Sequence, residues 1–373
     1  ADSLGGWRWG LGTWALVAAL AAIPWLGLAT HDRHLETTAP TISFRRVART
    51  GLSVSEVGFG GAGIGHVWGA TTDAECIAAV RRAVDLGINF FDTSPMYGGG
   101  RSEENLGRGL AGLRERVYIA TKTRLRTDAD LADMASAVRL SVEQSLRRLR
   151  TEVIDVLQVH HQLGPEGGQH LAAVGPPPRY AYRLTCDQAL ELGAAMQRMV
   201  AAGKVRFLGL TAWDGHPEAL EPLLASGVFH TAQILYNLLN RTAVTPPPAG
   251  FDDIDQGRTI PIARRNDIGI IGIRRHGDGA LADRLDRAGA PHSHVEGDHP
   301  PCRKLAFLKK GPFRTMSQVA LRYCLDNPAI ATVVPGVKSI GEVEEIAACP
   351  DLPSFDAHAM AALEHLYGRM FGD

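Results

Sequence analysis

The sequence predicts an α/β fold: a TIM-type (β/α)8 barrel with a short N-terminal β-hairpin and an apolar N-terminal extension. The main observation is that, from Ser43 onward, eight short apolar runs alternate with segments of helical periodicity. The runs are rich in β-branched residues and lack strict alternation of polar and apolar residues, which is typical of parallel strands buried on both faces. Eight such pairs within about 290 residues fit a closed barrel, although the alternation alone does not separate a barrel from a doubly wound sheet.

The expected strands and helices follow one another along the chain. The strands are Glu56–Gly60, Asn89–Ser94, Val117–Lys122, Val153–His160, Val205–Thr211, Thr231–Asn237, Ile268–Ile273 and Thr332–Gly336. Helical periodicity is clearest at Asp73–Leu86, Asp133–Arg150, Asp187–Ala202 and Thr315–Leu325. Thr72 is a suitable N-cap for the first helix, and Gly87 is a suitable stop signal.

Segments outside this alternation also have expected places. Phe44–Ala48 and Leu52–Val54 flank the turn at Thr50 and Gly51, so they predict a hairpin that covers the barrel floor. Three long polar segments are expected to be loops that shape the substrate mouth. These segments are Leu163–Arg183, Thr245–Arg258 and His276–Arg314.

Residues 1–40 are treated as a separate extension, and the barrel is assigned to residues 41–373. No residue from Trp9 to Thr30 is charged, and such a run is long enough to cross a bilayer or to serve as a signal sequence. An incidental or misassigned extension explains it equally well. We expect a cytoplasmic protein, with membrane anchoring through residues 9–30 as the alternative if the extension is retained.

The composition narrows the function. Lysine and arginine number 39 and the acidic residues 40, which argues against a nucleic-acid partner because phosphate binding needs a basic face. The five scattered cysteines form no CxxC pair and indicate reduced thiols. His292, His294, His299 and Cys302 lie close together in sequence but lack the spacing of a zinc site, so no metal is expected.

A glycine-rich motif at residues 58–63 matches the GxGxxG pattern of dinucleotide-binding folds. That fingerprint requires a helix that opens at its last glycine. The next helix signal comes only near Thr72, so we expect this match to be fortuitous.

Four polar residues lie at or just after the ends of expected strands: Asp92, Tyr97, Lys122 and His160. In a parallel barrel those ends face the same mouth. A buried charge needs a partner, which makes Asp92 and Lys122 a natural ion pair, although such pairs are often purely structural. A nearby cation is expected to lower the pKa of Tyr97 from about 10, so that the phenol exchanges a proton with a carbonyl or alcohol oxygen. His160 would orient that oxygen.

These residues lie in segments that resemble the aldo-keto reductase family, and the resemblance extends from about Phe44 to Ala348. The matching motifs are Gly87–Gly98, Ser102–Gly107, Ala120–Lys122, Asp155–His160, Gly203–Gly209, Gln233–Asn237 and Pro335–Ser339. The resemblance implies hydride transfer between NADPH and an aldehyde, ketone or sugar, with Tyr97 as the general acid/base. Asp92 and Lys122 would tune Tyr97, and His160 would position the substrate. His160 fits the family register better than His161, which should point to the opposite face of the strand.

The same resemblance implies the cofactor contacts. Tyr236 is expected to stack on the nicotinamide ring, while Thr211 and Gln233 would bind its carboxamide. The remaining candidates are Gly60 and Gly61 at the start of the pocket, Arg274 at the pyrophosphate, and Gly336, Lys338 and Ser339 around the adenosine 2′-phosphate. Trp68 is the candidate for the substrate pocket.

Three residues depart from the family pattern. Ala212 replaces an Asn that contacts the carboxamide, Glu342 stands where many relatives carry Arg or Gln, and Ile346 replaces an adenine-contacting Asn. A carboxylate such as that of Glu342 would repel a 2′-phosphate but accept a hydrogen bond from a free 2′-hydroxyl. We expect NADPH, with NADH as the alternative.

Two other functions are open at this stage. One is an NAD(P)-dependent sugar or polyol dehydrogenase, which is the same chemistry run in reverse. The other is a non-catalytic nucleotide-sensing subunit. The expected partner in either enzymatic case is a small carbonyl or alcohol.

Overall fold

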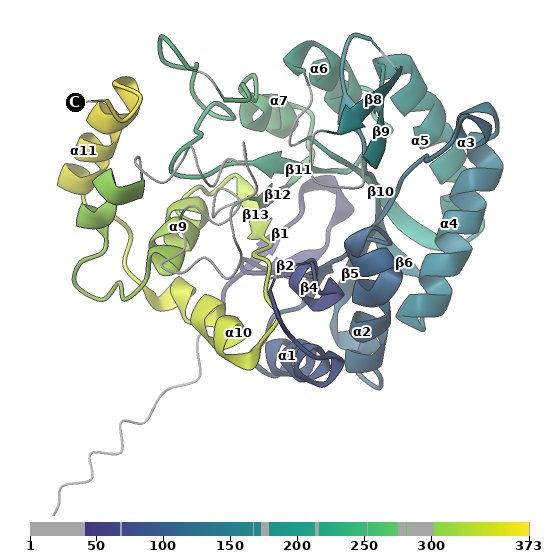
Figure 1. Ribbon diagram of the computed structural model, residues 1–373, viewed down its shortest axis with the longest axis horizontal. Coiled ribbons are helices and arrows are strands. Elements are labelled where there is room, and N and C mark those ends of the chain that lie inside the picture. Colours follow the sequence, from purple (N-terminus) through teal and green to yellow (C-terminus); the bar gives the residue numbers. More distant parts are fainter. Residues whose placement is uncertain are drawn as a thin grey trace, which may run out of the picture. The chain divides into compact units, whose positions relative to one another are not determined.

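Eight parallel strands form one sheet, and each is hydrogen-bonded to its neighbours in the order in which they follow one another along the chain. They are β3 (Phe59–Gly60), β4 (Phe90–Asp92), β5 (Tyr118–Thr123), β6 (Ile154–Val159), β10 (Val205–Thr211), β11 (Thr231–Leu235), β12 (Gly269–Ile273) and β13 (Ile330–Val333). The two edges of the sheet meet through the parallel bridges Val57–Val333 and Gly60–Gly336. The sheet therefore closes into a barrel, and the predicted fold class is confirmed (Figure 1).

The structure is a computed structural model that describes residues 42–67, 69–166, 168–172, 179–212, 216–251, 253–274, 281 and 302–372. Trp68, the apolar run at 9–30, and His292, His294 and His299 lie outside these residues. In the part of the chain that is described, no helix combines the length and apolar character needed to cross a membrane.

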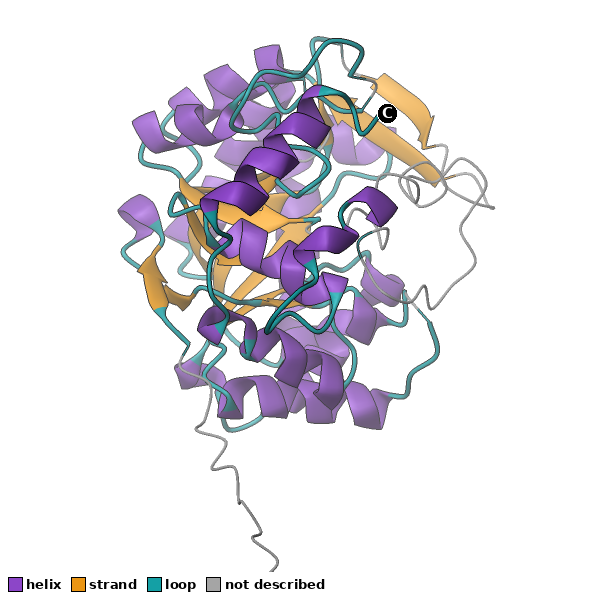
Figure 2. Ribbon diagram, turned by 90° about the vertical axis from the view of Figure 1, so that its left-hand side faces the viewer, coloured by secondary structure: helices purple, strands orange, loops and turns teal. Residues whose placement is uncertain are grey.

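Helices surround the strands (Figure 2). They are α1 (Asp73–Asp85), α2 (Arg101–Gly109), α3 (Asp128–Ala132), α4 (Met134–Leu149), α5 (Cys186–Ala201), α6 (Pro217–Ala225), α7 (Thr259–Arg265), α9 (Met316–Leu325), α10 (Ile340–Ala347) and α11 (Ala357–Gly368). The predicted N-cap of α1 is confirmed, because Thr72 Oγ1 accepts the Glu75 N–H and the Glu75 side chain accepts the Thr72 N–H. Gly87 follows the helix with φ 91°, a conformation that favours glycine.

The predicted hairpin is formed by β1 (Phe44–Arg46) and β2 (Ser53–Ser55), which pair antiparallel. Val47, Leu52 and Val54 are buried in one apolar cluster with residues from five barrel strands, among them Phe90 and Val156. The hairpin therefore fills the N-terminal end of the barrel, as the sequence predicted.

One expected loop contains strands. Within Leu163–Arg183, β8 (Gly168–Ala172) and β9 (Arg179–Leu184) form an antiparallel pair, and β7 (Gln162–Leu163) adds to β9. The expected loop therefore contains a small sheet, which the many glycines and prolines of the segment did not indicate. The segment 245–258 has neither helix nor strand among its described residues, as expected. Most of 276–314 lies outside the described residues.

The glycine run at 58–63 lies in the closed barrel, not in a dinucleotide-binding sheet. It passes through β3 into the short 3-10 helix η2 (Gly63–Gly65). The interpretation of the GxGxxG match as fortuitous is therefore confirmed.

Candidate active site

The four residues of the expected tetrad come from three neighbouring strands. Asp92 is the last residue of β4, Lys122 lies near the end of β5, and His160 follows β6. Tyr97 begins the short 3-10 helix η3 (Tyr97–Gly100), which follows β4. All four lie at the C-terminal ends of the strands, the end of such barrels where active sites form.

The ammonium group of Lys122 has a partner for each of its three N–H bonds. Nζ donates to Asp92 Oδ2 at 2.6 Å, to the carbonyl oxygen of Thr93 at 2.8 Å and to Tyr97 Oη at 3.3 Å. An ammonium group has three donors, so this set fixes its orientation. The Lys122 side chain is only 1% exposed. The predicted ion pair and its contact with the phenol are therefore both present.

The second carboxylate oxygen of Asp92 is held by two amides. Oδ1 accepts from Gln158 Nε2 at 2.9 Å and from Gln233 Nε2 at 2.6 Å. The sequence prediction gave Gln158 no role. The available signal was its position two residues before His160, because strand residues separated by two point to the same face.

The pKa of Tyr97 corrects one prediction. Burial raises the pKa of the phenol, and the opposing effect of the nearby Lys122 ammonium only partly offsets this. The predicted net lowering was wrong, because sequence shows the neighbouring cation but not the loss of solvent. Burial also opposes the charge on Lys122, but Asp92 and Tyr97 outweigh it and raise the pKa of Lys122. At neutral pH the site therefore holds a neutral phenol beside a charged ammonium.

His160 is a neutral imidazole at the edge of this group. Burial, reinforced by the cations of Lys122 and Arg124, lowers its pKa well below 6.5. Nδ1 lies 3.3 Å from Ser94 Oγ, and the ring is edge-on to Tyr97 with centroids 6.2 Å apart. His161 is also buried and accepts the Leu125 N–H through Nε2 at 2.8 Å, whereas His160 contacts Ser94.

Three cofactor candidates lie near the same strand ends. Thr211 and Gln233 are paired in register across β10 and β11, and the Thr211 hydroxyl donates to the Val159 carbonyl at 2.9 Å. Arg274 follows β12 with φ 55°, and its positive charge acts to lower the pKa of Tyr97. The structure therefore brings the amide of Gln233, the hydroxyl of Thr211 and the positive charge of Arg274 to the mouth that contains Tyr97.

Tyr236 has a different environment from the one expected. Its ring stacks on Tyr323 of α9 with centroids 5.2 Å apart, its hydroxyl donates to Tyr323 Oη at 3.0 Å, and it is 8% exposed. Gln233 points into the barrel, so a residue three positions later points outward. The structure thus gives Tyr236 a packing role against α9, and we leave it out of the proposed cofactor contacts.

Gly60, Gly61 and Gly336 lie where the barrel closes. A Cβ atom on Gly60 would lie 2.7 Å from the Pro335 carbonyl oxygen, and one on Gly61 would lie 2.8 Å from Ser102 Oγ. The missing side chains therefore allow β3 to approach the end of the last strand and the start of α2. Close packing within the protein already accounts for Gly60 and Gly61, whatever contacts they also make with a cofactor.

Ser339 and Glu342 form the N-terminal cap of α10. Ser339 Oγ accepts the Glu342 N–H at 3.3 Å, while Glu342 Oε2 accepts the N–H groups of Lys338 at 2.7 Å and Ser339 at 3.2 Å. The Glu342 carboxylate thus occupies the helix N-terminus, a place that also attracts phosphate. The sequence indicated the position of Glu342 but not this cap.

Comparison with known proteins identifies the relatives of this chain. Residues 56–367 match the model of the Aldo/keto reductase family. L-galactose dehydrogenase from Arabidopsis thaliana is 31% identical, over 84% of this chain and 90% of the relative. Aldo-keto reductase YhdN from Bacillus subtilis is 27% identical, over 82% of this chain and 88% of the relative.

Solved structures share the fold. The holo form of aldo-keto reductase AKR11C1 from Bacillus halodurans superposes with a TM-score of 0.64 at 20% identity, covering 88% of this chain and 97% of the other. An aldo-keto reductase from Klebsiella pneumoniae in complex with NADPH gives 0.60 at 22% identity, covering 88% and 96%.

Proposed function

This chain belongs to the aldo/keto reductase family of oxidoreductases, and we propose that it transfers a hydride between NADPH and a carbonyl compound, with Tyr97 as the proton donor. The observation that carries this proposal is the chain of contacts from Asp92 through Lys122 to Tyr97, with Nζ 2.6 Å from the carboxylate and 3.3 Å from the phenol oxygen. Two charges and a phenol are costly to bury together without a function.

The residues at the mouth suit a nicotinamide dinucleotide. Thr211 and Gln233 can hydrogen-bond a carboxamide, and Arg274 suits a pyrophosphate because guanidinium matches phosphate geometry. Lys338 and the Ser339 hydroxyl suit a 2′-phosphate. The bound dinucleotide would supply the hydride.

The protein's own groups would manage the proton. With its pKa raised by burial, Tyr97 keeps its proton at neutral pH and can donate it to a carbonyl oxygen as that oxygen gains negative charge. Lys122 then stabilises the phenolate left behind, since one of its N–H bonds already points at Tyr97 Oη. Neutral His160, whose ring lies edge-on to that of Tyr97, can donate a hydrogen bond that orients the carbonyl.

Replacing Tyr97 by Phe tests this role. We expect kcat for aldehyde reduction to fall by about 10³-fold, because the proton donor is lost. The dissociation constant for NADPH should stay within about twofold, since the substitution removes only a hydroxyl. Turnover of the variant at the parental rate would contradict the assignment of Tyr97.

A second candidate is the oxidation of a sugar or polyol, and the similarity to L-galactose dehydrogenase favours it. In that direction Tyr97 must accept a proton, so a raised pKa predicts oxidation that increases toward alkaline pH. Assays of aldehydes with NADPH and of aldoses with NADP⁺ across pH would decide between the two directions.

NADPH remains our choice of cofactor, with NADH as the alternative that Glu342 supports. Its carboxylate is fixed at the N-terminus of α10 beside Lys338 and Ser339, where it would face a 2′-phosphate. Michaelis constants for both cofactors, measured with Glu342→Gln alongside the parent, test the choice. A strong parental preference for NADH that the substitution reverses would overturn it.

A further inference from the structure

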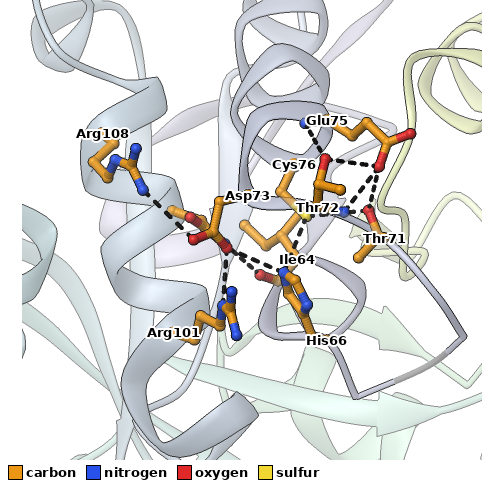
Figure 3. Close-up of polar contacts among 10 residues, drawn as sticks. Ile64, His66, Thr71, Thr72, Asp73, Glu75, Cys76, Arg101 and Arg108 are labelled. Atoms are coloured by element: carbon orange, nitrogen blue, oxygen red, sulfur yellow. Dashed lines mark hydrogen bonds and ion pairs between the residues drawn. The ribbon is translucent and has the colours of Figure 1, made fainter.

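Asp73, the first residue of α1, is the centre of a polar cluster outside the tetrad (Figure 3). Its Oδ1 accepts hydrogen bonds from Arg101 Nε at 2.8 Å and from Asn105 Nδ2 at 2.9 Å, and it lies 3.1 Å from His66 Nε2. Arg108 is more distant, with NH1 3.7 Å from Oδ2. Hydrogen bonds from Arg101 and then Asn105 are the main cause that lowers the pKa of Asp73, so the carboxylate stays charged across the working pH range.

This cluster joins two segments, the loop 61–72 after β3 and the helix α2. His66 belongs to the loop, while Arg101 and Asn105 belong to the helix. The buried side chains of the helix reach the loop directly as well. Asn105 Nδ2 donates to the Ile64 carbonyl at 2.9 Å, and Ser102 Oγ donates to the Gly61 carbonyl at 2.7 Å. The first part of the loop is therefore hydrogen-bonded to α2 at Gly61 and at Ile64.

This loop lies directly against the backbone of Tyr97. A Cβ atom on Gly65 would lie 2.8 Å from both the carbonyl carbon and the oxygen of Tyr97, and one on Gly98 would overlap the Gly65 carbonyl. No side chain separates these two stretches. A shift of the loop would therefore be transmitted to the turn that carries the phenol.

The turn itself has little stiffness of its own. Gly98, Gly99 and Gly100 follow Tyr97 with φ of 64°, 65° and 103°, and then Arg101 begins α2. Glycine adopts these conformations easily but also leaves them easily, because it has the widest conformational freedom. The position of Tyr97 must therefore be held from outside the turn.

We propose that Asp73 and Arg101 are positioning residues for Tyr97. Their ion pair links the first residue of α2 to α1 and, through His66 and Asn105, to the loop that lies against the turn. The phenol is thereby kept within reach of Lys122 Nζ, a contact of 3.3 Å that a small displacement would break. This inference rests on the proposed role of Tyr97 as proton donor.

Two arginines on α2 provide a matched test. The side chains of Arg101 and Arg108 are 47% and 46% exposed, and both point toward Asp73 (Figure 3). Arg101 makes the 2.8 Å contact and adjoins the glycine turn, whereas Arg108 is 3.7 Å away and about two helical turns further along the same face. Removing either side chain deletes the same charge and a similar amount of exposed side chain, so the two variants differ in the 2.8 Å contact with Asp73 and in the link to the turn.

The experiment compares Arg101→Ala with Arg108→Ala in the full chain. We expect kcat for aldehyde reduction to fall about tenfold in the first variant, because a displaced proton donor slows the chemical step. NADPH affinity, followed by titration of the purified protein, should stay within about twofold in both variants. Arg108→Ala should keep the parental kcat.

A second series at Asp73 separates positioning from loss of fold. Asn keeps an oxygen that accepts from Arg101, whereas Ala keeps none, so kcat should decrease from the parent to Asp73→Asn to Asp73→Ala. Equal kcat for the two arginine variants, or a loss of kcat that only parallels a loss of Tm, would overturn the inference. An inactive parent, or a fully active Tyr97→Phe, would instead overturn the proposed function itself.

Discussion

Asp92 and Asp155 are two buried carboxylates that bind cations at opposite ends of the same barrel. Asp92 ends β4 and pairs with Lys122, whose side chain is 1% exposed. Asp155, near the start of β6, binds Arg114 and Arg206, both at 2.7 Å, and their side chains are 26% and 46% exposed. It also accepts the Ile119 N–H at 2.9 Å.

The two carboxylates differ in how far the cations that they bind are exposed to solvent. At Asp155 the two guanidinium groups reach toward solvent and remain hydrated. The carboxylate, through Arg206 and the Ile119 N–H, links β6 to β10 and β5 at the barrel floor. At Asp92 the cation is enclosed, and its third N–H is directed at a phenol. A buried ion pair is therefore a poor sign of catalysis by itself. What distinguishes the Asp92–Lys122 pair is its contact with the titratable hydroxyl of Tyr97.

The most direct test of this difference between Asp92 and Asp155 is to replace each of them by Asn. We expect Asp92→Asn to lower kcat by about 100-fold, because the ammonium group loses the charge that holds it under Tyr97. Asp155→Asn should leave kcat within about twofold and lower the free energy of unfolding by about 1–3 kcal/mol, since the carboxylate accepts several hydrogen bonds.

Steady-state kinetics and urea unfolding on both variants, well below their Tm, would measure these effects. If Asp155→Asn lost as much turnover as Asp92→Asn, the distinction between a catalytic end and a structural end would be wrong.

The role of Gln158 sharpens the comparison, because it contributes one of the two amides on Asp92. We expect Gln158→Met to lower kcat about tenfold, since the carboxylate loses one hydrogen bond that holds it toward Lys122. Gln256→Met is the control: Gln256 is also fully buried, but in the segment after β11, where its backbone N–H binds Thr242. An equal decrease in kcat in both variants would show that Gln158 contributes only packing.

The smallest expected effect concerns His160 and pH. The pKa of His160 lies well below 6.5 in the folded protein. As the pH falls, the imidazole therefore gains its proton in the unfolded chain before it does so in the folded one. The unfolded state then binds more protons, so stability decreases below pH 6.5 and is fully present above it. Between about pH 7.5 and about pH 5.5 we expect a loss of about 1 kcal/mol from this residue.

His160→Gln should remove that part of the pH dependence, with the exposed His358→Gln as the control for loss of an imidazole. Urea unfolding at the two pH values measures it. An unchanged dependence in His160→Gln would mean that this imidazole has the same pKa in the folded and unfolded chains, which would contradict the lowered pKa.

The sequence by itself predicted the eight strands of the barrel and the four residues of the proposed tetrad. Repeated apolar runs set the eight strands, and the position of Asp92, Lys122 and His160 at the ends of those runs was enough to bring them to one mouth, because parallel strands end at the same rim. Capping of α1 by Thr72 and the hairpin at the floor also followed from local patterns.

Only the tertiary structure decided which groups meet and how much solvent they keep. Gln158 on β6 reaches Asp92 on β4, Tyr236 stacks on Tyr323, and burial outweighs Lys122 in setting the pKa of Tyr97. The period of a strand tells which face a side chain takes, but its partners there come from segments far along the chain. Desolvation depends on all of these partners together, so no single stretch of sequence predicts it.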